Sequence, residues 1–395
     1  MTADYSTLSV HAGFQGGDPV SRARAVPIAT STAYFEDPET HAQLNPTVHV
    51  LEERITALTG GISTVAVSSG VSAISLALFT ITQAGDNFVS ASTLYGGTYN
   101  QFAIGFERLD IHVKFAKGAD PTSIESLIDE KTKAIYVESI FNPGLGVPDL
   151  AAISNVAKAA GIPLIVDNTF GACSYLIDPI KLGAVIVVQS ATKWIGGHGV
   201  AIGGVVTDAG RLDWSAGVRS TGICDAMRLE VAPQFGTDLS AFNAFLLLHG
   251  LETISLRVDR QCSNALALAL WLQKHPNVSW VVYPGLPDHP EHENARKFMH
   301  RGKYGSILTF GVRGGREAAK NVVNTVKLCS HMTSVGDNQT LVTQPATTTH
   351  HQLSEEAQLR AGVTPDMIRV SVGIENILDI QVDLDRAMSA PIPPP

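Results

Sequence analysis

The chain has 395 residues, 45% of them hydrophobic and 16% charged, which is enough for two or three domains with a large buried core. Its formal net charge of −9 argues against nucleic acid and anionic membranes as partners. No apolar run reaches membrane-spanning length, and MTADYSTLSV has neither a basic start nor an apolar segment typical of a signal peptide, so we expect a soluble cytoplasmic protein. The cysteines are scattered without a Cys-x-x-Cys pair, and we expect reduced thiols at Cys173, Cys224, Cys262 and Cys329.

The N-terminal residues 1–44 are rich in Thr, Ser, Ala and Pro with weak periodicity, and we expect an extended arm rather than a domain. A helix is predicted to begin after Asn45, a good N-cap residue, because Pro46 is well tolerated at the first helical position. The glycines Gly60 and Gly61 are expected to end it.

Strand and helix patterns then alternate. Short β-branched runs predict seven strands, at 63–67, 86–92, 111–116, 133–139, 162–170, 184–190 and 203–208. Helices are predicted between them at 71–82, 121–130 and 148–161. This alternation is typical of a doubly wound, mostly parallel sheet. We therefore predict an α/β fold whose large domain, residues 45–240, carries seven strands.

The pattern changes after residue 236. Residues 240–275 are helical in pattern and partly hydrophobic all round, as expected of one connecting helix buried between domains or subunits. Further strands are predicted at 278–283, 306–312 and 368–374, mixed with helices. Residues 241–395 are therefore predicted to form a smaller α+β C-terminal domain that ends in a disordered tail, APIPPP.

Polar residues follow several predicted strands, and ligands of open α/β sheets bind at the carboxyl ends of strands. Ser69 and Gly70 open a helix after the first strand, where N–H groups can hold a phosphate. Tyr95 lies on a glycine turn, from which its ring could stack on a flat ligand. Asn142 follows the KAIYVES strand, and Asp167 ends the apolar run IPLIVD. Each also has a simpler interpretation as a helix cap, a surface residue or a turn former.

The strongest signal is the segment 183–204, GAVIVVQSATKWIGGHGVAIGG. Ser190 and Thr192 can bind phosphate oxygens, and the glycines let the backbone approach a flat ligand. Lys193 follows a buried strand between apolar residues, which favours a functional lysine over a surface one. It could serve as a charge for phosphate or as an amine for a Schiff base. With the other strand-end residues, this set has the parts that a pyridoxal phosphate (PLP) site needs.

Four motifs occur in the order LYGGTYN, VDNTF, SATKWIGGHG and IRVSVGIE. They resemble the Cys/Met-metabolism family of PLP-dependent enzymes, and the resemblance extends from HAGFQGGDP to SVGIENILDI. It implies the type I PLP-dependent transferase fold. The phrases KTKAIYVESIFNP and GSILTFGVRGG are most similar to the O-acetylhomoserine sulfhydrylase branch.

The resemblance also implies roles for single residues. Lys193 would hold the cofactor as a Schiff base and move protons in catalysis. Tyr95 would stack on the ring, and Asp167 would keep the pyridine nitrogen protonated. Asn142 would face the ring hydroxyl. The phosphate would be bound by Ser69, Gly70, Val71, Ser190 and Thr192.

The substrate and the reaction are implied in the same way. Arg369 would clamp the substrate carboxylate bidentately, with Ser334 nearby. The implied reaction is γ-replacement on O-acetyl-L-homoserine, with sulfide or a thiol giving homocysteine or a homologue in methionine biosynthesis. The alternatives are a carbon nucleophile in secondary metabolism, a γ-lyase releasing an α-keto acid and ammonia, and a non-catalytic scaffold. A cytoplasmic homotetramer, built as a dimer of dimers, is also implied.

The chain departs from the family at two joins. Leu44 runs directly into Asn45 where relatives carry a longer segment with a Tyr-x-Arg pair that reaches the phosphate in the neighbouring subunit. An insertion of the sulfhydrylase branch is missing near Gly217–Val218. Our hypothesis is that mobile active-site loops, not included in these 395 residues, belong at both joins.

Smaller departures concern specificity and metal binding. Val71, Gln189 and Gln344 differ from the residues usual in relatives and, by family likeness, lie near the cofactor or the substrate, which leaves the nucleophile open. Three histidines of PDHPEHENARKFMH match no standard zinc spacing and indicate a polar surface loop rather than a metal site; they are His289, His292 and His300.

Overall fold

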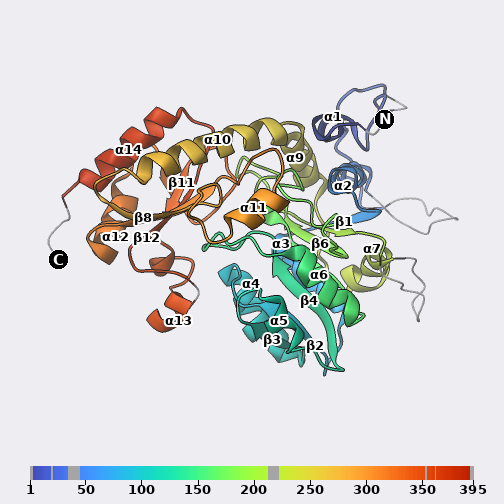
Figure 1. Cartoon of the computed structure of the whole chain (residues 1–395). Helices are drawn as coiled ribbons and strands as arrows, with labels where there is room; N and C mark the ends of the chain where they lie inside the picture. The colour runs from blue at the N-terminus through green and yellow to red at the C-terminus, as the bar shows by residue number, and fades with distance from the viewer. Residues whose placement is uncertain are drawn as a thin grey trace.

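The computed structural model describes residues 3–18, 21–33, 45–211, 222–351, 354–360 and 362–391. Its larger sheet has seven strands in the order β1-β7-β6-β5-β4-β2-β3 (Figure 1). The strands are β1 (Ser63–Val67), β2 (Asn87–Ala91), β3 (His112–Ala116), β4 (Thr132–Glu138), β5 (Leu164–Asp167), β6 (Ile186–Ser190) and β7 (Gly204–Asp208). All neighbours are parallel except that β7 runs antiparallel to β1 and β6. The prediction of a seven-stranded, mostly parallel sheet is confirmed.

Helices cover both faces of this sheet. Successive residues of a strand point to opposite sides, so each central strand contributes apolar side chains to both faces. Ile165 packs into the apolar cluster that contains α3 (Gly70–Ile81), whereas Val166 packs into the cluster that contains α6 (Leu150–Ala159). Burial on both sides explains why the central strands are nearly continuous apolar runs. The remaining helices of this part are α2 (Pro46–Thr59), α4 (Gly96–Asn100), α5 (Pro121–Glu125), α7 (Ile223–Ala226) and α8 (Ala232–Phe235), with π-helical turns at Gln101–Phe106 and Met227–Val231.

A smaller five-stranded sheet has the order β10-β11-β12-β9-β8 and mixed strand directions. Its strands are β8 (Val278–Val282), β9 (Ile307–Val312), β10 (Ser330–His331), β11 (Leu341–Thr343) and β12 (Met367–Ser371). The helices of this part are α9 (Ala241–Glu252), α10 (Ile254–Leu272), α11 (His292–Phe298), α12 (Gly315–Thr325), α13 (Glu355–Arg360) and α14 (Ile377–Ser389). Figure 1 shows α10 extending from the smaller sheet toward α9. The predicted domain boundaries stay predictions.

The N-terminal arm is not extended throughout, because Tyr5–His11 form the helix α1. Asp4 caps this helix by accepting a hydrogen bond from Ser6 N at 3.0 Å. The Tyr5 hydroxyl donates to Cys173 O at 2.9 Å. A cap and a long-range contact therefore stabilise a helix that the weak sequence periodicity did not predict.

The prediction of a single connecting helix at residues 240–275 is also wrong, because the chain forms two helices there, α9 and α10, which meet at Thr253. Thr253 has φ −115° and ψ 9°, outside the helical region. The helix predicted at 121–130 ends at Glu125. Asp129 then turns the chain into β4, since its carboxylate accepts from Lys131 N at 3.0 Å and Thr132 Oγ1 at 3.1 Å.

Some expectations fall on residues outside the described ranges. The two joins, Leu44–Asn45 and Gly217–Val218, each include such residues, and so does most of the APIPPP tail. All four cysteines are described, and each is buried and free. Within the described ranges, no helix has both the length and the apolar character required to cross a membrane.

Candidate active site

A cavity of about 490 Å³ lies where the carboxyl ends of β4, β5 and β6 meet the N-terminus of α3. Residues 332–335 and β12 contribute to its lining from the region of the smaller sheet. The cavity is lined by every residue to which the sequence analysis assigned a role: Ser69, Gly70, Val71, Tyr95, Asn142, Asp167, Ser190, Thr192, Lys193, Ser334 and Arg369. Residues far apart in the chain are thus brought to one place.

Lys193 follows β6 and is half-buried in the cavity wall. Its Nζ donates a hydrogen bond to Ser334 Oγ at 3.0 Å. Burial, and then the positive charge of Arg369, lower the pKa of the Lys193 ammonium. The neutral amine, which can attack an aldehyde, is therefore more populated than in a free lysine. The neighbouring Thr192 hydroxyl hydrogen-bonds to the backbone O and N of Gly203, at 3.2 and 3.1 Å.

The start of α3 forms a cradle suited to a phosphate. Ser69 caps the helix by accepting from Ser72 N at 3.1 Å. A Cβ added to Gly70 would lie 2.7 Å from the Cβ of Ser190, so glycine is needed for α3 to begin so close to the end of β6. The first N–H groups of a helix have no intrahelical acceptor. Those of Gly70 and Val71 can therefore donate to an anion beside the Ser190 hydroxyl.

Asp167 is a carboxylate held at the end of β5. Its Oδ2 accepts from the Tyr136 hydroxyl at 3.2 Å, and its Oδ1 accepts from Thr169 N at 2.8 Å. Burial raises the pKa of Asp167, and these hydrogen bonds oppose the rise. Thr169 Oγ1 in turn accepts from Ser190 N at 2.9 Å, which ties the ends of β5 and β6 together. A cationic ring nitrogen would be a suitable partner for this buried carboxylate.

Tyr95 presents its ring at the mouth of the cavity, where it is 46% exposed. A Cβ on Gly97 would lie 2.5 Å from the Tyr95 ring, so glycine leaves room for the ring over the first turn of α4. Tyr95 N donates to Glu138 Oε1 at 2.7 Å, and the same carboxylate accepts from the backbone of Asn142. Burial and then the charge of Asp167 raise the pKa of Glu138 well above its ordinary value.

Glu138 was not among the residues predicted from the sequence, although it lines the cavity. The available signal was a charged residue at the end of an otherwise apolar strand, KAIYVES. Thr98, Thr169 and Thr333 also line the cavity and carry no comparable signal.

Arg369 lies on β12 and is 2% exposed. Its Nη1 donates to Asn142 Oδ1 at 3.0 Å, and its Nη2 donates to Thr333 O at 2.6 Å. Burial lowers the pKa of Arg369 to about 10. Its buried Nε has no hydrogen-bond partner within the described part of the chain. A fixed guanidinium with a donor to spare is suited to bind a carboxylate.

Of the three residues expected near the cofactor or the substrate, only Val71 lines the cavity. Gln344 instead donates to Arg316 O at 3.0 Å and Pro365 O at 2.8 Å. Gln189 is buried on β6, and because it adjoins Ser190 in a strand it points to the opposite face of the sheet. With these side-chain positions, neither Gln189 nor Gln344 contacts a ligand in the cavity.

The residues present fit pyridoxal phosphate. The contact between Gly70 and Ser190 brings helix N–H groups and a hydroxyl to one point, which suits a phosphate dianion. Asp167 offers a carboxylate for the ring nitrogen, and Lys193 offers an amine of lowered pKa for the aldehyde. Tyr95 supplies an aromatic face at the same cavity.

Comparisons with known proteins identify the family of the chain. The family described as Cys/Met metabolism PLP-dependent enzymes matches residues 6–389. Homocysteine synthase of Schizosaccharomyces pombe is 47% identical, over 97% of this chain and 98% of its own. O-acetyl-L-homoserine sulfhydrylase 1 of Thermus thermophilus is 44% identical, over 98% of this chain and 100% of its own.

A solved structure from Campylobacter jejuni, a putative O-acetylhomoserine (thiol)-lyase in which a lysine carries a pyridoxyl phosphate, is similar with a TM-score of 0.93. It is 30% identical and covers 98% of this chain and 100% of its own. The similarity thus spans both sheets and the cavity between them. The chain belongs to the Cys/Met metabolism family of PLP-dependent enzymes, and its cofactor is pyridoxal phosphate.

Proposed function

We propose that the protein is an O-acetyl-L-homoserine sulfhydrylase, which converts O-acetyl-L-homoserine and sulfide into L-homocysteine and acetate. The Cγ–O bond of the substrate breaks, a Cγ–S bond forms, and acetate leaves. The observation that carries the proposal is one cavity in which Lys193 lies with a phosphate cradle and the buried Arg369. Relatives named homocysteine synthase and O-acetyl-L-homoserine sulfhydrylase, at 47% and 44% identity, support the choice of substrate.

Proton transfer is assigned to Lys193. When bound, pyridoxal phosphate supplies an aldehyde for the substrate amine and a ring that takes up electron density from Cα. Lys193 Nζ is proposed to remove the Cα proton and then a Cβ proton, since its lowered pKa favours the neutral base. Asp167 keeps the ring nitrogen protonated, because a buried carboxylate gains most from a cationic partner.

Substrate orientation is assigned to Arg369 and Ser334. The guanidinium of Arg369 is already fixed by Asn142 Oδ1 and Thr333 O, so little side-chain entropy is lost when it binds the substrate carboxylate. Ser334 Oγ accepts from Lys193 Nζ at 3.0 Å in this structure. Its hydroxyl can turn to the carboxylate once the lysine engages another group.

We further propose a cytoplasmic homotetramer, a dimer of dimers, that acts in methionine biosynthesis. The apolar side chains exposed at the mouth of the cavity support association, because exposed apolar patches mark interaction sites. They include Val71, Ile202 and Met332, with exposures of 47%, 59% and 53%.

Product analysis tests the reaction. The purified holoenzyme is incubated with O-acetyl-L-homoserine, alone and with sulfide, methanethiol or a carbon acid, and the products are identified by mass spectrometry. Homocysteine and acetate are expected with sulfide, and the Lys193→Ala variant is expected to form neither. An α-keto acid and ammonia without any nucleophile would instead indicate a γ-lyase. A product with the carbon acid alone would overturn the sulfhydrylase proposal.

A further inference from the structure

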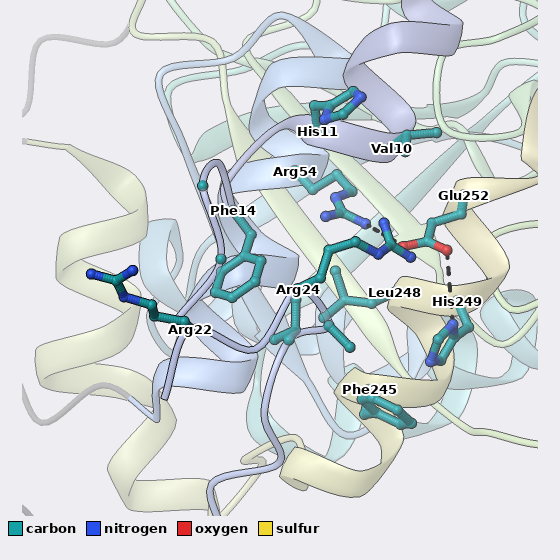
Figure 2. A pocket seen from close by; sticks show the side chains of 14 residues that line it. Val10, His11, Phe14, Arg22, Arg24, Arg54, Phe245, Leu248, His249 and Glu252 are labelled. Carbon is teal, nitrogen blue, oxygen red and sulfur yellow. Dashed lines mark ion pairs between the residues drawn. The ribbon is translucent and has the colours of Figure 1, made fainter. Parts of the chain in front are cut away.

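A second cavity, of about 280 Å³, lies between the N-terminal arm and the helices α2 and α9. It shares no lining residue with the active-site cavity. Its lining residues come from three parts of the chain, namely the arm (within 10–17 and 22–26), Arg54 of α2 and residues 245–252 of α9 (Figure 2). Nothing in the proposed reaction uses these residues.

The cavity concentrates positive charge in a chain whose formal net charge is −9. Its charged lining consists of one carboxylate and three guanidinium groups, with two histidines beside them: Glu252, Arg22, Arg24, Arg54, His11 and His249. Even with both histidines neutral, the lining keeps a positive excess. A concave site with such an excess attracts anions.

Arg54 is built into the wall of this cavity. Its side chain is 2% exposed, and its Nε donates to Ala12 O at 3.0 Å. Its buried Nη1 has no hydrogen-bond partner within the described ranges, and Glu252 Oε1 lies 3.7 Å away, too far for a hydrogen bond. A buried charged donor without an acceptor is costly. An oxyanion would provide the acceptor that the protein does not.

Arg24 adds a second guanidinium to the same place. In Figure 2, Arg24 and Arg54 both point toward Glu252, whereas Arg22 points away. The Glu252 carboxylate also lies close to His249, with 3.8 Å between Glu252 Oε2 and His249 Nδ1. No described acidic residue forms an ion pair with Arg24. One shared carboxylate thus leaves guanidinium donors free for a second anion.

We propose that this cavity binds a small organic anion, a carboxylate or a phosphate ester, between Arg24 and Arg54. The apolar part of the ligand would lie against Phe14, Phe245 and Leu248, which also line the cavity. A volume of about 280 Å³ suits a small metabolite. Because Arg24 belongs to the arm and Arg54 to α2, bound anion would hold the arm on the helices.

Calorimetric titration of the PLP-loaded enzyme tests the site. The bound cofactor occupies the phosphate cradle of the active site, and the Arg24 and Arg54 variants distinguish this cavity from carboxylate binding at Arg369. Succinate and inorganic phosphate are titrated separately at an ionic strength fixed with chloride, and the two arms distinguish a carboxylate from a phosphate ligand. Saturable binding of at least one anion is expected. Arg24→Gln and Arg54→Lys are each expected to weaken it roughly tenfold or more, because each removes a charged hydrogen bond.

The matched control is Arg296→Gln. Arg296 is an exposed arginine that pairs with Glu293 at 2.8 Å and does not line the cavity, so this variant should bind like the wild type. Trypsin supplies a second readout, because bound anion should slow cleavage after the exposed Arg22. Absence of saturable binding, or equal affinity in the wild type and Arg24→Gln, would overturn the proposal. Arg24 is exposed on the arm, so its variant tests the site even if Arg54→Lys does not fold.

Discussion

At the scale of single residues, Glu138 connects the backbone at two residues that are proposed to bind the cofactor. It lies in register with Asp167 across β4 and β5, and it accepts from the backbone of Tyr95 and Asn142. Glu138→Ala removes this acceptor and is expected to lower kcat roughly tenfold, because a buried donor left without an acceptor costs about 1–3 kcal/mol. Glu138→Gln keeps a carbonyl acceptor and should recover most of the rate. Steady-state kinetics and the cofactor absorbance spectrum measure both variants.

The activity of Glu138→Gln distinguishes two roles of Glu138, namely hydrogen-bond acceptance and negative charge. If Glu138→Gln loses as much activity as Glu138→Ala, the negative charge rather than hydrogen-bond acceptance is what matters. Glu125→Ala, an exposed carboxylate on α5, serves as the control and should leave kcat unchanged.

His350 is expected to make stability depend on pH. Burial and then the charge of Arg369 lower the pKa of His350 to about 4, from 6.5 in the unfolded chain. Below pH 6.5 the unfolded chain therefore binds a proton that the folded chain binds only near pH 4. Stability falls over this window, by roughly 2 kcal/mol per chain between pH 7 and pH 5. His350→Gln should reduce the fall, measured as the change in urea midpoint between these pH values.

The neighbouring His351 provides the comparison for this measurement. It is exposed, whereas His350 is 4% exposed. His351→Gln should retain the wild-type dependence on pH. An unchanged difference between pH 7 and pH 5 in His350→Gln would contradict the prediction.

The position of the strand-end residues at one cavity could be predicted from the sequence, because it follows from local patterns, whereas their roles stay predictions. Asp167 directly follows an apolar run, and Ser69 and Lys193 follow theirs within a few residues. The topology of a parallel sheet brings such residues together. Glu138 could not be identified in this way. Its importance depends on contacts with Tyr95 and Asn142, which only the folded chain shows.

At the scale of secondary structure, the approach of α3 to β6 depends on Gly70. Gly70→Ala would place a Cβ 2.7 Å from the Cβ of Ser190, so α3 must move away from the strand end. Such overpacking costs about 1–3 kcal/mol. We expect PLP affinity to fall roughly tenfold or more, because the phosphate donors come from both elements. Equilibrium dialysis of the apoenzyme against PLP measures this affinity.

Gly105→Ala is the matched control for this substitution. A Cβ there meets no atom within 4 Å, and the residue does not line the active-site cavity. Its PLP affinity should equal that of the wild type. Equal affinity in Gly70→Ala would show that the contact with Ser190 does not position the phosphate donors.

The helices show where sequence patterns were insufficient. α1 depends on the contact of Tyr5 with Cys173, which is remote in the chain. The break at Thr253 lies inside a stretch that is helical in pattern throughout. There, α9 ends against another segment, since a Cβ on Gly250 would lie 2.2 Å from Ile195 O. Local periodicity contains no information on such tertiary contacts.

At the scale of the whole molecule, the active site depends on both sheets. Lys193 follows β6 of the larger sheet, and Arg369 lies on β12 of the smaller sheet. The sequence predicted Lys193 from its local pattern and Arg369 through the resemblance to a family. It did not provide the relative placement of the two sheets, which fixes Lys193 Nζ at 3.0 Å from Ser334 Oγ.

The exposed apolar residues at the mouth of the active-site cavity lead to a prediction about assembly. Ile202 and Met332 are 59% and 53% exposed there, although they are large and apolar. A second copy of the chain that covers this mouth would remove them from water, which contributes about 25 cal/mol per Å² of apolar area. Light scattering after size exclusion should therefore give a mass of four times 41.9 kDa for the wild type. Ile202→Glu should lower this mass, whereas Leu109→Glu, an exposed apolar residue that does not line the cavity, should not. A wild-type mass of 41.9 kDa would contradict the proposed assembly.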